Sequence, residues 1–505
     1  MVAKDCGWST GPLHEGKECI WAERDSVSGI SAWSMVLDDT HPCCCITLMN
    51  RTGLNRRRIW GALVWCLAIG FVSDTALAEL SLQTSLNVEE MYTDNLFYRD
   101  TEKEEDFGTY VGPNATLRFE NPDIVLGARY FGRFIFFVNH PSRNRYVQNA
   151  NILLDLPFLT KRYQGLSVTV DESMNFTPQL DAFSFSQAED SSSLAGANPT
   201  LGGGGTVSGV GSSSAGSGGA FGGLGGTQGI FTRRASAFNN NAGLTVGYEW
   251  TPQLTTTLAY ANQYRHFFSS GFQDSMTHMG TISLPYRMTQ GTTVTPMYSY
   301  RQTEFLGQST QATLADRMIF HNMTLGLTQD LTPSVSMSVN GGVSFMKQEG
   351  ATEQVPGPGN TTVERVIGHK FVGRFIGGAT LSKTYRQGTV SLTARQNTGS
   401  GGGLASQGTW TRTITGRILH DFSTRLSGFG SLGYAQNNSV GGNAFKATTY
   451  RGQVGLRYSF LRWLYGAVSY SHIDQRSKGT VATDLVVNQV FLSLSAVADP
   501  WYLFR

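Results

Sequence analysis

Cysteine is absent from most of this 505-residue chain. All six cysteines lie in the first 78 residues, as Cys6, Cys19, Cys43, Cys44, Cys45 and Cys66. The three adjacent ones lack the C-x-x-C spacing that lets two thiolates face one metal ion. From residue 79 onward the chain therefore has no disulfide, no thiol chemistry and no cysteine metal site. Such a composition suits export to an oxidising compartment, where an unpaired thiol is a liability.

Long apolar runs are also absent. The run Ile59–Val72 has 14 residues, whereas a membrane-spanning helix needs about 20. Residues 56–58 are arginines and residues 76–78 read Ala-Leu-Ala. A basic start, a short apolar core and an A-x-A end are typical of a secretory signal peptide. The sequence therefore predicts a cut between Ala78 and Glu79.

The position of this signal is unusual, because 48 residues precede Met49. Residues 49–78 alone form an ordinary signal peptide. We therefore expect translation to start at Met49, with residues 1–48 an over-extended and unstructured N-terminus. Residues 79–505 are then the mature domain.

A strong net charge is missing from the mature domain. The first 78 residues hold 7 of the 39 basic and 8 of the 37 acidic side chains, which leaves 32 and 29, or +3. A nearly neutral chain lacks the basic footprint of a nucleic-acid-binding protein. We expect no nucleic-acid partner.

Amphipathic helical patterns are almost absent, and two-residue alternation takes their place. In YRGQVGLRYSF (450–460) the apolar Tyr450, Val454 and Leu456 oppose Arg451, Gln453 and Arg457. Segments 241–250 and 124–136 alternate in the same way. Side chains of a strand point to opposite faces in turn. Many such segments run 11–15 residues, against about 5–6 in soluble proteins, and many carry an aromatic at one end. This pattern is typical of transmembrane β-barrels.

Turn and loop signals give the strand count. Eight short turns rich in Asp, Asn, Pro and Gly alternate with nine longer polar loops, which requires 18 strands. The predicted fold is an all-β, antiparallel, up-and-down transmembrane barrel over residues 79–505, with both termini in the periplasm; 16 or 20 strands are also compatible. One strand is expected at 363–382 and the last at 485–498.

Eight arginines fall on the predicted inner face of the barrel. They are Arg118, Arg129, Arg133, Arg265, Arg301, Arg374, Arg451 and Arg457. One interpretation is a wet wall in which they pair with carboxylates and water. The other is a basic constriction that favours anionic solutes or acidic glycans.

Two predicted outer loops carry further signals. Residues 196–229 hold 15 glycines in 34 positions, which predicts a flexible outer loop or one that folds into the lumen and closes it. The acidic segment 92–107 is either a solvated loop or, through Glu102, Glu104, Glu105 and Asp106, a site for a divalent cation. It lacks the spacing of a dedicated calcium loop, and we predict no metal or other cofactor.

The start of the mature chain resembles a family of outer-membrane β-barrel porins. The matching stretch is Y-T-D-N-L-F, residues 92–97, followed by FGTYVGPNATLRF at 107–119. The resemblance implies an outer-membrane barrel, and some relatives are associated with exopolysaccharide or exosortase loci. It supplies no catalytic residues.

Three functions follow as hypotheses. The first is a water-filled, porin-like diffusion channel of the outer membrane that favours anions. The alternative is an exopolysaccharide export or structural barrel that depends on periplasmic partners. The third is an outer-membrane enzyme, for which the seven scattered histidines after residue 79 and the lack of an H-E-x-x-H or G-x-S-x-G motif give no support. Expected partners are outer-membrane lipid, the barrel-assembly machinery and a second copy of the chain.

Overall fold

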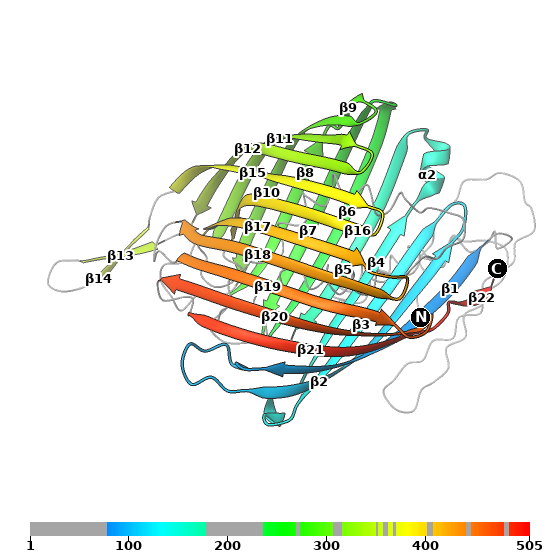
Figure 1. The fold of residues 1–505 in the computed structure, drawn as a ribbon. Helices are drawn as coiled ribbons and strands as arrows, with labels where there is room; N and C mark the ends of the chain where they lie inside the picture. The colour runs from blue at the N-terminus through cyan, green and yellow to red at the C-terminus, as the bar shows by residue number, and fades with distance from the viewer. Residues whose placement is uncertain are drawn as a thin grey trace, which may run out of the picture. The chain divides into compact units, whose positions relative to one another are not determined.

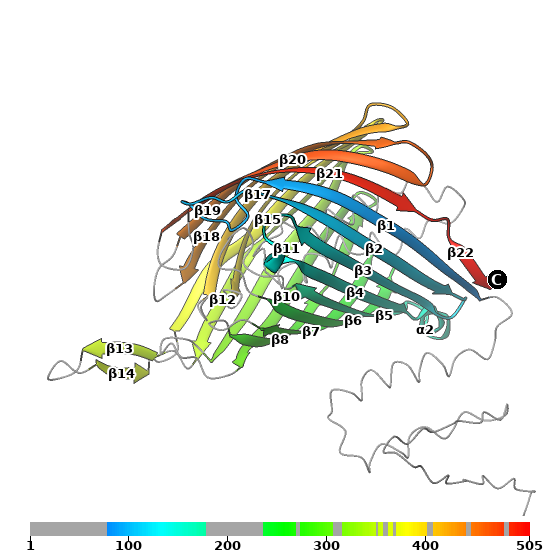
Figure 2. The same cartoon turned by 90° about the horizontal axis from the view of Figure 1, so that it is seen from below.

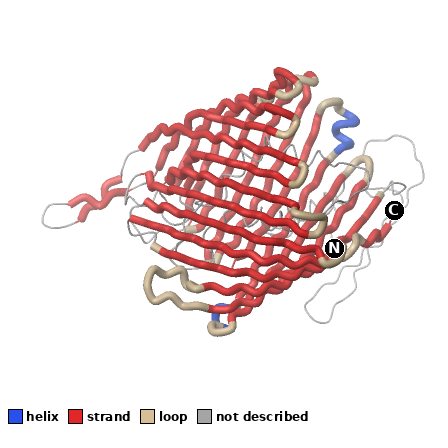
Figure 3. The backbone as a smooth tube through the Cα atoms, viewed as in Figure 1, coloured by secondary structure: helices blue, strands red, loops and turns tan. Residues whose placement is uncertain are grey.

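The computed structural model describes residues 78–177, 236–268, 273–306, 316–349, 352–356, 362–366, 370–400, 408–440, 446–478 and 484–504. Nearly all of them are strands (Figure 1 and Figure 3). The first strands are β1 (Glu79–Thr93), β2 (Asp106–Glu120), β3 (Val125–Phe137), β4 (Arg145–Asp155), β5 (Leu166–Thr177), β6 (Ala237–Thr251), β7 (Leu254–Phe267), β8 (Asp274–Ser283), β9 (Tyr286–Thr289), β10 (Thr292–Leu306), β11 (Arg317–Thr332) and β12 (Val335–Glu349). The others are β13 (Thr352–Pro356), β14 (Thr362–Val366), β15 (Lys370–Tyr385), β16 (Gly388–Ser400), β17 (Gly408–Asp421), β18 (Leu426–Val440), β19 (Lys446–Ser459), β20 (Leu464–Lys478), β21 (Leu485–Val497) and β22 (Trp501–Phe504).

The sheet closes on itself. Neighbouring strands of the barrel are antiparallel and follow chain order, with β10 beside β8 and β15 beside β12, and β1 pairs with β21 through nine residues from Ser85 to Thr93. β9 continues β8 beside β10, and β22 continues β21 beside β1. The 20 strands of this sheet therefore occupy 18 positions. The predicted fold, a closed antiparallel barrel of 18 strands, is confirmed.

Among the described residues, two short helices lie between strands. They are η3 (Pro141–Arg143), between β3 and β4, and α2 (Pro157–Arg162), in the connection from β4 to β5. No helix in the described ranges is long and apolar enough to cross a membrane.

The outward face of the barrel is apolar, as a lipid-facing surface must be. Leu432 is 73% exposed, Leu492 61% and Val454 58%, although all three lie in the middle of long strands. Aromatic pairs lie at strand ends. The ring centres of Tyr248 and Trp250 are 4.6 Å apart near the short turn that follows β6. Figure 2 shows the strands tilted around the barrel, and period-two alternation puts the polar residues on the inner face.

One expected boundary was wrong, and one short strand was missed. The segment 363–382 is not one strand, because β14 pairs only with β13 in a separate hairpin and β15 begins at Lys370. The strand expected at 485–498 is β21, but a further strand, β22, follows it, in which Trp501 pairs with Leu82 and Tyr502 with Ser81. The break between β21 and β22 falls at Pro500, whose nitrogen cannot donate a ladder hydrogen bond.

A carboxylate interrupts the apolar outward face of β5. Glu172 lies in the middle of β5 and shares a face with Met174, which is 38% exposed. Asn240 of β6 donates a hydrogen bond to its Oε1 at 2.9 Å. A carboxylate on the lipid-facing side of a barrel strand is costly.

Candidate functional site: the inner face of the barrel

The strand register places all eight predicted arginines on the inner face. In each strand, the arginine lies on the side opposite the exposed apolar side chains. They are Arg118 on β2, Arg129 and Arg133 on β3, Arg265 on β7, Arg301 on β10, Arg374 on β15, and Arg451 and Arg457 on β19.

Arg133 is held by residues of two neighbouring strands. Its Nη2 forms an ion pair with Glu89 of β1, and both side chains are largely buried, at 22% and 16% exposed. The guanidinium carbon also lies 4.0 Å from the centre of the Tyr110 ring. Three strands thereby hold one cation at the wall through a charge and an aromatic face.

Three other inner-face arginines have different partners. Arg265 Nε donates to Asn239 Oδ1 at 2.6 Å, and the Arg457 guanidinium carbon lies 4.0 Å from the centre of the Tyr465 ring. Arg118 forms an ion pair with Glu120 at 2.6 Å near the short-turn end. An amide, an aromatic ring and a carboxylate thus position these guanidinium groups at the wall.

The sequence analysis missed four arginines of the same face: Arg145 on β4, Arg287 on β9, Arg395 on β16 and Arg417 on β17. The signal was present, because Arg395 alternates with Val390, Leu392 and Ala394 in a period-two pattern.

Inner-face carboxylates lie mainly at the short-turn ends of their strands: Glu120, Asp155, Glu249, Asp330 and Asp421. Glu89 and Asp171 lie farther along the wall. The middle of the described inner wall is therefore predominantly basic.

The first long loop, residues 94–105, folds onto the inner face. Leu96 is 2% exposed and packs with Met91, Tyr110, Ile135 and Phe137, all on the inner face of β1–β3. Tyr98 packs against a second inner cluster on β20 and β21. The inner face of these strands was predicted to be polar. Its apolar residues are explained by the loop 94–105, which covers them.

The Y-T-D-N stretch anchors this loop across the closure of the barrel. Asp94 accepts hydrogen bonds from the backbone N and the side-chain Nδ2 of Asn488, at 2.7 and 2.6 Å. Asn95 is fully buried. Its Nδ2 donates to the carbonyl oxygens of Val486 and Arg99 at 3.1 and 2.6 Å, and its Oδ1 accepts from Arg99 N at 2.9 Å.

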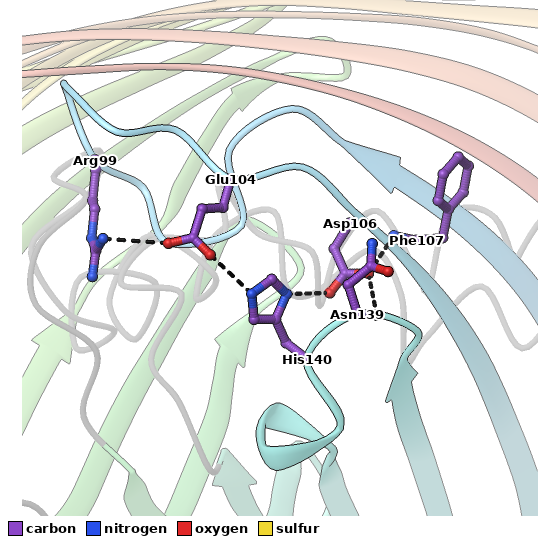
Figure 4. Close-up of polar contacts among 6 residues, drawn as sticks. All are labelled: Arg99, Glu104, Asp106, Phe107, Asn139 and His140. Carbon is purple, nitrogen blue, oxygen red and sulfur yellow. Dashed lines mark hydrogen bonds and ion pairs between the residues drawn. The ribbon is translucent and has the colours of Figure 1, made fainter.

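The acidic residues of this loop point to different partners (Figure 4). Glu104 Oε1 lies 3.5 Å from Arg99 and its Oε2 lies 2.9 Å from His140 Nε2. Glu105 accepts from Tyr92 Oη at 2.7 Å, and Asp106 pairs with His140. Within the described ranges no group of three or more metal-ligating side chains is close enough together to hold an ion.

Arg301 differs from the other arginines because the ends of β16 and β17 cover it. It is only 7% exposed. Its Nη2 donates to the carbonyl oxygen of Thr398 at 3.0 Å, and its guanidinium carbon lies 4.0 Å from the centre of the Phe320 ring. A solute in the lumen does not reach Arg301 in this conformation.

Two segments with predicted roles lie outside the part of the chain that the structure describes. The glycine-rich loop 196–229 and residues 1–77 lie outside the described residues. Glu79 is the first residue of β1, so a cut between Ala78 and Glu79 leaves that strand whole.

Comparison with known proteins gives one family match. Residues 371–497 match the model described as "Putative beta-barrel porin 2". The match spans β15 to β21, at the opposite end of the chain from the Y-T-D-N stretch, and it confirms the expected likeness to a porin family. With the closed barrel and its apolar outward face, it identifies a porin-like barrel of the outer membrane. Both features suit a channel better than an enzyme.

Solved barrels of low identity are also similar. OccK3 (OpdO) of Pseudomonas aeruginosa is 13% identical, with a TM-score of 0.39 over 83% of this chain and 96% of that one. OccK2 (OpdF) of the same organism is 12% identical, with a TM-score of 0.41 over 84% and 98%. These values are too low to carry any solute over to this chain. No curated protein sequence matches it.

Proposed function

We propose that the barrel is a water-filled diffusion channel of the outer membrane that favours anionic solutes, and that it performs no catalysis. The predominantly basic middle of the inner wall is the observation that supports this function. An 18-stranded barrel has room for an aqueous lumen, and a narrow wet passage lined by one sign of charge concentrates counter-ions within it.

The uneven placement of charge supports a direction of selectivity. Arg374, Arg395 and Arg451 lie along the middle and long-loop parts of their strands, whereas the carboxylates lie mainly near the short turns. A small anion that enters from the long-loop end therefore meets these guanidinium groups before it meets the carboxylates near the short turns. A cation meets the same groups as an electrostatic barrier.

Conductance of the mature chain tests the proposal. Residues 79–505 are refolded, inserted in a planar bilayer and held in a tenfold KCl gradient. We expect steady channels whose reversal potential lies closer to the equilibrium potential of chloride than to that of potassium. Arg451→Gln should show a smaller preference for anions. The control is Arg476→Gln, because Arg476 has 63% side-chain exposure and lies on the outward side of β20.

Two results overturn this function. Cation-preferring channels contradict the selectivity, and a folded barrel that carries no current contradicts the open channel. The silent result leaves the partner-dependent export barrel as the function to test next, by adding periplasmic components of the same gene neighbourhood.

A further inference from the structure

The long-loop ends of β16 and β17 leave the barrel wall. Pairing of β15 with β16 stops at Gly377 and Gln396. Beyond that point β15 continues beside β12 as far as Lys370, while β16 continues beside β17 until Ser400 meets Gly408. The wall therefore divides, and the two strand ends, residues 396–400 and 408–412, are here named the inturned ends.

The inturned ends contact strands that are not their neighbours in the sheet. Thr398 Oγ1 lies 2.7 Å from Ser344 Oγ of β12, although β15 lies between β12 and β16. Trp410 packs against an inner-face cluster of Phe305, Met318, Phe320 and Met346. Thr398 and Ser344 can touch only if the inturned ends pass over the inner side of β15.

This cover buries the cluster almost completely. Met318 and Phe320 are fully buried, Met346 is 2% exposed and Phe305 is 8% exposed. Burial of large apolar side chains is the main favourable contribution to folding. Apolar burial therefore holds the inturned ends inward and keeps them inside the lumen, where they narrow the passage.

Arg301 adds a polar attachment to this apolar one. A buried cation is costly unless hydrogen bonds and an aromatic face compensate it. The Thr398 carbonyl and the Phe320 ring supply these contacts. Because Thr398 belongs to an inturned end, Arg301 is compensated in this way only while that end lies inward.

We propose that the inturned ends are the size-selecting constriction of the channel, and that Arg301 is the positioning residue that holds them. Arg374 of β15 lies 5.9 Å from the Trp410 ring at this constriction, so the solutes admitted are small anions that pass its guanidinium. This inference rests on the proposed channel function.

The first experiment fixes the position of the inturned ends. The mature chain has no cysteine, so Ser344→Cys with Thr398→Cys introduces the only thiols. Their Oγ atoms lie 2.7 Å apart, which a disulfide spans with small adjustment. We expect rapid oxidation in the folded barrel, seen by mass spectrometry. Ser344→Cys with Ser431→Cys, on the distant inner face of β18, is the control that should stay reduced. Failure of the first pair to oxidise overturns the inward position, whether or not the barrel conducts.

The second experiment tests Arg301 in the bilayer. Arg301→Leu should raise single-channel conductance and admit larger anions, because the inturned ends lose their polar attachment. The disulfide added to Arg301→Leu should restore the original conductance, and a reductant should remove that rescue. Arg118→Leu removes an equal charge from the inner face without touching the inturned ends, so its conductance should not rise. Folding of every variant is checked by the mobility shift between heated and unheated samples.

The outcomes separate this inference from the channel function. If the original chain conducts and Arg301→Leu has the same conductance and size limit, the constriction is overturned while the channel function stands. If the original chain is silent and Arg301→Leu conducts, the channel function fails and the inturned ends are retained as the closing element. If both are silent, both proposals fail.

Discussion

His140 Nδ1 lies 2.7 Å from Asp106 Oδ2 and joins the loop after β3 to the start of β2. The other ring nitrogen lies 2.9 Å from Glu104, so one imidazole bridges two carboxylates (Figure 4). Hydrogen bonding to Asp106, and then to Glu104, raises the pKa of His140 above its ordinary 6.5 despite the opposing effect of burial.

The bridge should depend on pH. A pKa that is raised on folding stabilises the contact fully below the unfolded pKa and loses that stabilisation as pH rises through the folded pKa. Hydrogen exchange of residues 94–105 should therefore be slower in the original chain than in His140→Gln near pH 5.5, and equal in the two near pH 9.5. Comparison at each pH removes the intrinsic pH dependence of exchange. Equal exchange at both pH values would contradict a working bridge.

Glu89 should tune the charge of the lumen through Arg133. Glu89→Gln removes the carboxylate that neutralises the Arg133 guanidinium, so the anion-to-cation permeability ratio should rise by roughly twofold. Arg133→Gln leaves Glu89 without its cation and should lower the ratio by a similar factor. Reversal potentials in a salt gradient measure both. Changes of the same sign in the two variants would rule out this pairing as a control on selectivity.

Asn95 should stabilise the closure of the barrel. Asn95→Ala removes three hydrogen bonds in a fully buried position and should lower the free energy of unfolding by about 2–3 kcal/mol. Urea unfolding of the refolded barrel measures this. Asp100→Ala changes an exposed residue of the same loop and should lie within about 0.5 kcal/mol of the original chain. An equal effect of both substitutions would count against the anchor.

Glu172 should destabilise the barrel in lipid. Glu172→Leu removes an outward carboxylate and should raise the free energy of unfolding in bilayers by about 1 kcal/mol. Asp171→Leu removes the same charge from the neighbouring inner-face position of β5 and should give no such gain. A loss of stability in Glu172→Leu would show that something other than lipid covers this part of the outward face.

Period-two alternation predicted much of the barrel. The alternating segment 450–460 lies on β19, which runs from Lys446 to Ser459 and so includes all but its last residue. The same alternation assigned Arg451 and Arg457 to one face, because residues an even number of positions apart in a strand point to the same side of the sheet.

Alternation could not predict which inner residues are covered. Met318 and Phe320 interrupt the polar face of β11, and their burial depends on β17 residues about 90 positions away along the chain. Arg301 had the same local pattern as Arg451, yet only Arg301 is covered by Thr398. The β13–β14 hairpin was missed because its residues are as strand-like as those of β15, and pairing alone separates them.

The bond between Asp94 and Asn488 joins positions 394 residues apart in the chain. It can form only when the first and the last long strands have reached each other, and it then fixes the loop that covers the inner clusters beside them. Docking of the Y-T-D-N stretch, at the start of the barrel sequence, therefore requires that the last long strand is already in place. A chain that stops short of β21 keeps β1 and most of the barrel sequence, but its first loop has no site to dock on. Residues 94–105 of such a chain should therefore be cut by an added protease faster than those of the closed barrel.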